Sequence, residues 1–119
     1  MVAIGWWLIA AGFLTGAGIG MLIQEDGWLG GYDHRRRRLV RLGHIALVAL
    51  GALNVVWPLT AAARTSLAPT IGLCFLTGGL TMAPVCFLTA WDWRCRALFV
   101  VPASVLVLGV KLAGWGSLP

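Results

Sequence analysis

The sequence has little charge, and very little of that charge is negative. Of 119 residues only 11% are Asp, Glu, Lys or Arg and four are acidic, whereas 60% are apolar. Soluble domains are about a quarter charged and about half apolar. A short chain buries only about two-thirds of its unfolded surface, so the surplus apolar surface has to face something other than water. The shortage of charge therefore disfavours a soluble domain and favours one lipid-embedded domain spanning residues 1–119.

Cysteine is also scarce, and recognisable catalytic motifs are missing. Cys74, Cys86 and Cys95 are odd in number and lack C-x-x-C spacing, which disfavours a disulfide framework and a structural zinc site. The chain has no phosphate-cradling glycine loop, paired carboxylates or Ser/His/Asp set. Strands of a membrane β-barrel would alternate with a period of two, and no such alternation occurs. We therefore predict helices, no catalytic residues and no enzymatic activity of the chain itself.

Long apolar runs are what the sequence does contain. A helix needs roughly 20 apolar residues to cross a hydrocarbon core of about 30 Å. Four segments meet that length, at about residues 2–23, 39–59, 67–90 and 97–115. The joining segments are short, which makes neighbouring helices antiparallel. The expected fold is an all-α integral membrane protein, an up-down bundle of four transmembrane helices.

The basic residues predict the orientation of these helices. Five of the nine lie together after the first helix, at Arg35, Arg36, Arg37, Arg38 and Arg41. Cytoplasmic loops are enriched in arginine and lysine, so both termini are expected outside (N-out/C-out). The run reads as a topology signal and a contact for anionic lipid headgroups rather than as a nucleic-acid site. A multi-pass position in a bacterial inner (cytoplasmic) membrane follows as the expected location.

Tryptophan supports the same orientation. Interfacial belts of tryptophan mark both faces of spanning bundles. The predicted topology places four of the seven tryptophans near the outer face and three near the inner face: Trp6, Trp7, Trp57 and Trp115, then Trp28, Trp91 and Trp93.

Glycine forms a ladder in the first helix. Gly12, Gly16 and Gly20 are spaced four apart and so share one helix face, where another backbone can approach closely. Two alternatives stay open for the helix that packs there: it belongs to this chain or to another subunit. A flat cofactor lying on the same face is a further alternative.

A few residues of the inner half could bind a cofactor. His44 lies near the start of the second helix, and ionisable groups in spanning helices are candidates for function because burying them in lipid is costly. On helix three, Cys86 is expected near the depth of His44, and Met82 one turn deeper on the same face. Histidine with methionine and cysteine suits copper, histidine with methionine suits haem, and imidazole can also bond a quinone carbonyl. The alternative is a neutral histidine bonded to a backbone carbonyl.

Two further expectations concern polar residues. The carboxylates Glu25, Asp26 and Asp33 are expected to pair locally with arginines at the cytoplasmic face; a proton entry point or a docking patch for a charged partner is the alternative. Asn54 is expected to link helices by a hydrogen bond.

Three functions are compatible with these features. The first is a small non-catalytic accessory subunit of a larger membrane complex, such as a respiratory or photosynthetic electron-transfer complex. Its partners would be membrane lipids and other membrane subunits, with no nucleic acid. The second is a haem- or copper-binding redox protein that uses His44 with Met82 and Cys86. The third is a small transporter or quinone-handling protein.

Overall fold

Four helices long and apolar enough to cross a membrane make up most of the computed structural model, which describes residues 1–31 and 33–117. The α-helices are α1 (Val2–Leu22), α2 (Arg35–Val56), α3 (Ala68–Trp91) and α4 (Val100–Gly116). Short 3₁₀ helices join them at Trp28–Gly30, Trp57–Leu59, Ala61–Arg64 and Trp93–Phe99. The prediction of an all-helical chain with four potential membrane spans is confirmed.

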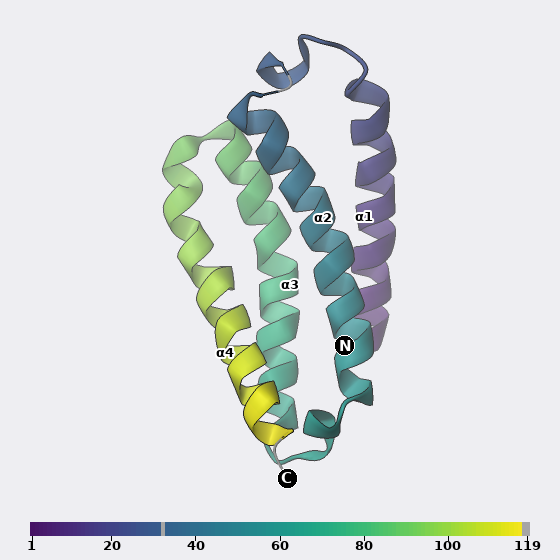
Figure 1. Ribbon diagram of the computed structural model, residues 1–119, viewed down its shortest axis with the longest axis vertical. Coiled ribbons are helices and arrows are strands. Elements are labelled where there is room, and N and C mark those ends of the chain that lie inside the picture. Colours follow the sequence, from purple (N-terminus) through teal and green to yellow (C-terminus); the bar gives the residue numbers. More distant parts are fainter. Residues whose placement is uncertain (32, 118–119) are drawn as a thin grey trace.

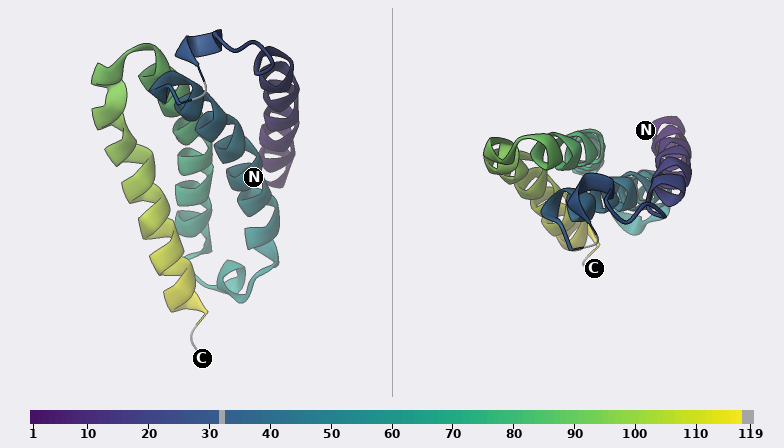
Figure 2. Two further views of the ribbon diagram at one scale, coloured as in Figure 1. Left: turned by 45° about the horizontal axis from the view of Figure 1, so that its top comes forward. Right: turned by 90° about the horizontal axis from the view of Figure 1, so that it is seen from above.

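Consecutive helices run antiparallel and lie in chain order as an open row (Figure 1). α1 packs on α2, α2 on α3, and α3 on α4, whereas α1 and α4 lie on opposite sides of the molecule (Figure 2). The start of α1 and the end of α4 therefore point toward one end, and the start of α2 and the α3–α4 connection lie at the other (Figure 1). The row leaves the fourth potential span, Trp93–Gly116, exposed. In its apolar 18-residue stretch 11% of the residues are buried, against 50% in the corresponding stretch of α3.

The helix ends differ from the predicted ones where local hydrogen bonds decide them. α2 begins at Arg35 instead of residue 39, because the Nδ1 atom of His34 accepts a hydrogen bond from the Arg36 N–H (3.3 Å) and caps the helix. The fourth span starts as the 3₁₀ helix Trp93–Phe99, where the Asp92 carboxylate accepts from the Arg94 N–H (2.9 Å). Arginine is a good helix former, so the basic run extends α2 into the predicted loop.

Asn54 links α2 to α3 in the middle of the row. Its side chain is fully buried, and its Nδ2 donates to the carbonyl oxygens of Leu50 (2.9 Å) and Phe75 (3.0 Å). Gly79 leaves the space for this amide, since a Cβ there would lie 3.1 Å from Nδ2. The predicted interhelical hydrogen bond of Asn54 is confirmed.

Candidate functional site

The glycines of α1 face α2, and their lack of side chains sets the separation of the two helices. Near the start of α1, Gly5 opposes Gly51: a Cβ on either would lie 2.8 Å from the other's carbonyl oxygen. In the middle of α1, a Cβ on Gly12 would lie 3.1 Å from the Val48 backbone nitrogen. Of the predicted ladder, Gly12 and Gly16 therefore pack within the chain. A Cβ on Gly20 would meet no neighbouring atom within 4 Å, so Gly20 faces open space.

His44 uses the room that this seam provides. Its imidazole lies against Gly16, where a Cβ would meet Nδ1 and Nε2 at 2.9 Å. The Nδ1 atom lies 2.7 Å from the Gly12 carbonyl oxygen. A carbonyl can only accept, so this contact requires a proton on Nδ1 and, in the neutral ring, leaves a lone pair on Nε2. Among the described residues Nε2 has no hydrogen-bond partner, and the ring borders a hollow of about 320 Å³.

Met82 and Cys86 line a different hollow from His44. Their hollow, of about 280 Å³, lies between α2, α3 and α4. The His44 ring instead turns toward α1, and neither of these two hollows is lined by all three side chains. The described residues also contain no group of three His, Cys, Asp or Glu side chains placed to hold a metal ion. The structure thus places Met82 and Cys86 together on the α4 side of α2, and His44 on the side of α2 that faces α1.

Cation–π contacts between arginine and tryptophan connect the segments at the end of the row that carries the arginine run. Arg35 stacks on Trp93 at 4.0 Å from the ring centroid, and Arg96 approaches the same ring at 5.1 Å. Both distances fall within the roughly 6 Å reach of a cation–π contact. Since Arg35 begins α2 and Trp93 follows α3, these contacts join the two connections at this end of the row.

Arg37 plays a separate part from its neighbours. It is 4% exposed, and its Nη2 donates to the Ile23 carbonyl oxygen (2.5 Å) beyond the end of α1. Its guanidinium also lies 5.9 Å from the centroid of the Trp28 ring. Arg37 therefore anchors the α1–α2 connection, a structural role that the sequence analysis, which grouped it with the lipid-contact arginines, did not assign.

The acidic residues at this end make few ion pairs. Within residues 1–31 and 33–117, the ion pair found is Arg38 with Asp33 at 3.9 Å, and both side chains are exposed. Glu25 and Asp26 are exposed at the end of α1. The predicted local pairing is therefore found for Asp33 and, among the described residues, not for Glu25 or Asp26.

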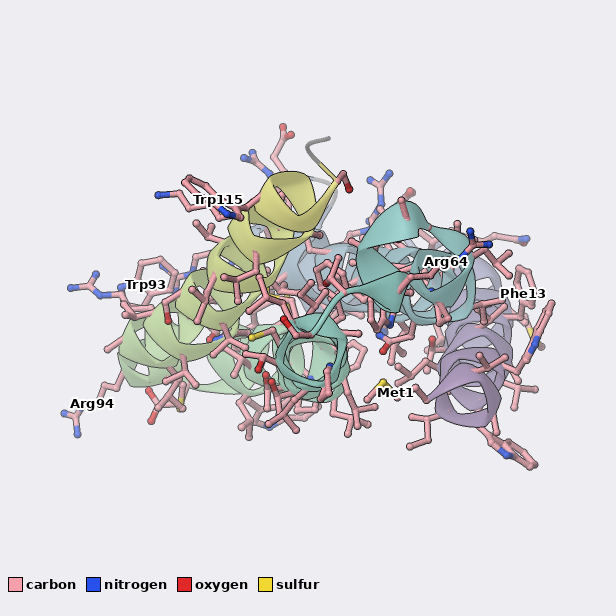
Figure 3. All side chains as sticks on the ribbon, turned by 90° about the horizontal axis from the view of Figure 1, so that it is seen from below. Met1, Phe13, Arg64, Trp93, Arg94 and Trp115 are labelled. Carbon is pink, nitrogen blue, oxygen red and sulfur yellow. The ribbon has the colours of Figure 1, made fainter. Side chains whose placement is uncertain are left out.

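One ridge of α2 separates three adjoining hollows. A basic hollow of about 280 Å³ is lined by Arg38, Arg41, Leu42 and Ile45. The hollow beside α1 contains Phe13, His44, Ile45, Val48 and Ala49. The hollow beside α4 includes Leu42, Ile45, Ala49, Met82, Cys86 and Leu106. Ile45 borders all three, so they adjoin one another along α2. Figure 3 shows Phe13, which lines the hollow beside α1, projecting outward from α1.

Two buried polar groups were not anticipated. Thr89 is 1% exposed and Trp57 is 6% exposed, and neither Thr89 Oγ1 nor Trp57 Nε1 has a hydrogen-bond partner among the described residues. Nothing in the sequence marks Thr89, because a threonine in an apolar helix ordinarily bonds the carbonyl of its own preceding turn. Trp57 instead contributes its ring, which packs edge-on against Phe75 at 5.9 Å.

The comparisons with known proteins add no relatives: no protein-family model, no curated protein and no solved structure matches this chain.

Proposed function

We propose that the chain is a multi-pass integral membrane protein, N-out/C-out in a bacterial inner membrane, that serves as a small non-catalytic subunit of a larger membrane complex. Its four apolar helices have the length that spanning requires. An electron-transfer complex is the host class that we propose to examine first. The role would be to brace the helices of a partner subunit and to exclude lipid from its surface.

The observation that carries the subunit role is the outer face of α1. Small and large residues alternate along it at spacings of four and three: Ala3, Trp7, Ala10, Leu14, Ala17 and Met21. All six are exposed, and the three large ones are exposed by 76% or more. A repeat of seven residues keeps one seam facing a partner helix, with large side chains as knobs and small ones as holes. Lipid contact alone requires no such spacing, so the pattern favours a helix of another subunit.

Extraction of the native protein in a mild detergent tests this proposal. We expect the chain to co-migrate with other membrane subunits, and Ala10→Phe to release it, because the added ring fills a hole in the seam. Ala103→Phe is the matched control, since Ala103 is exposed on α4, away from the seam. A wild-type chain that runs as a monodisperse species without other subunits would overturn the subunit role.

A second candidate function is the binding of a haem at His44. The observation in its favour is the lone pair on Nε2. The hydrogen bond from Nδ1 to the Gly12 carbonyl fixes the ring and, in the neutral imidazole, leaves this lone pair available to a ligand. Metal-ligating histidines are commonly fixed in this way by a backbone carbonyl at the other nitrogen. Met82 and Cys86, which the sequence suggested as further ligands, line another hollow and are not part of this proposed site.

A cofactor at His44 would be recognised by analysis of the purified protein. We expect a Soret band in the wild type that is lost in His44→Gln, whose amide can still donate to the Gly12 carbonyl but offers no ring nitrogen. Gly20→Ala, on the open part of α1, is the control. Colourless protein without a Soret band would refute this second function.

A further inference from the structure

We infer that the three adjoining hollows on α2 form one binding site for a single anionic phospholipid. The Arg38 and Arg41 guanidinium groups would hold its phosphate, and one acyl chain would lie on each side of the Ile45 ridge. The proposal rests on membrane insertion from the proposed function, and is independent of the subunit role.

The order of residues along α2 matches the order of groups in a lipid. Arg38 and Arg41 come first, and the apolar positions Leu42, Ile45 and Ala49 follow toward the middle of the helix. At 1.5 Å per residue, Ala49 lies about 12 Å deeper than Arg41. A phospholipid in the leaflet at the basic end has its phosphate at the surface and its chains pointing the same way.

The shape of the surface suits two chains. The hollow beside α1 measures about 320 Å³ and the one beside α4 about 280 Å³. Each lies near the low end of the roughly 300–1,000 Å³ found for small-molecule pockets, which favours one narrow chain in each. Both adjoin the basic hollow through Ile45, so two chains can diverge from one headgroup.

Charge favours an anionic headgroup. Arg38 and Arg41 are exposed and lie in the first two turns of α2, where the helix dipole adds partial positive charge. Arg35 and Arg36 precede them and Asp33 lies 3.9 Å from Arg38, in an exposed pair that water and salt screen. Guanidinium groups bind phosphate oxygens in bidentate geometry. The balance of charge at this hollow is therefore positive.

Native mass spectrometry of the purified protein, titrated with phosphatidylglycerol or phosphatidylcholine of the same acyl chains, tests the headgroup. We expect a single phosphatidylglycerol to bind more tightly than phosphatidylcholine. Each arginine near an anionic lipid contributes about fivefold in affinity, so the double variant Arg38→Gln/Arg41→Gln should bind phosphatidylglycerol about 25-fold more weakly. Arg94→Gln/Arg96→Gln removes the same charge at the same end of the molecule and should change binding by less than about threefold. An equal loss in both double variants would overturn the site in favour of a diffuse basic surface.

Two further arms test the acyl chains. Ala49 lines both apolar hollows, so Ala49→Leu should weaken binding of both phospholipids, whereas Ala103→Leu on α4 should not. Soluble glycerol phosphate should not displace bound lipid. Unchanged binding in Ala49→Leu, displacement by glycerol phosphate, or a co-purified quinone in place of phospholipid would each overturn the proposal. If the protein is recovered from membranes but binds phosphatidylglycerol and phosphatidylcholine equally, the lipid site alone is refuted. If the protein is recovered in the soluble fraction, membrane insertion is refuted as well.

Discussion

Replacing Gly5 with alanine is expected to destabilise the packing of α1 on α2. A Cβ at Gly5 would lie 2.8 Å from the Gly51 carbonyl oxygen and 2.8 Å from Val55 Cγ2, about 0.6 Å inside the 3.4 Å at which ordinary contact begins. A side-chain methyl group can turn away, but the carbonyl belongs to the α2 backbone, so the helices have to separate. Overpacking of this kind costs about 1–3 kcal/mol.

Gly18→Ala is the matched control for this change. Gly18 lies on the same helix, and a Cβ there would meet nothing within 4 Å. Alanine improves helix propensity by about 1 kcal/mol at both positions, so the difference between the two variants isolates the steric cost. Unfolding in detergent with increasing dodecyl sulfate, followed by the fluorescence of the seven tryptophans, measures that difference. If the two variants unfold at the same dodecyl sulfate fraction, the close approach of α1 and α2 at Gly5 is wrong.

Three further predictions concern Asn54, Arg37 and Cys95. Asn54→Ala should lower the free energy of unfolding by about 1–3 kcal/mol, because it removes the bond to α3 and leaves a cavity; the exposed Ser104→Ala should change it by less than about 0.5 kcal/mol. Arg37→Gln should speed proteolysis of the α1–α2 connection, as judged by limited digestion, whereas the exposed Arg36→Gln should leave it unchanged, and equal rates would argue against the anchor. Cys95, which is partly exposed at the basic end, should react with a membrane-impermeant maleimide only after cells are permeabilised. Labelling of Cys95 in intact cells would reverse the proposed orientation.

The helices themselves were predictable because the signal lies in composition and length. Proline also punctuates the ends of these helices: Pro58 lies in the 3₁₀ helix Trp57–Leu59 after α2, and Pro69 lies in the first turn of α3. The start of α2 was placed four residues late, since the apolar run begins at Leu39 but a hydrogen bond at His34 sets the first turn. Asn54 was assigned correctly because an amide in an apolar helix has few other ways to be satisfied.

The candidate site was only partly predictable. Depth along the helix axis can be counted from the sequence, and it placed His44 and Cys86 at similar levels. Rotation about the axis cannot be counted in the same way, because it depends on which neighbour each helix packs against. Packing on α1 turns His44 toward Gly12 and Gly16, whereas Met82 and Cys86 border the α4 side of α2.

The sequence by itself thus determined four apolar helices, their order and the concentration of positive charge at one end, because hydropathy and charge are properties of residues taken one at a time. Only the tertiary structure decided that the helices form an open row, that Gly12 and Gly16 are used within the chain, and that Arg38, Arg41 and two apolar hollows adjoin one ridge of α2. Those features depend on which helix faces meet, and close backbone contact at the glycines selects the faces.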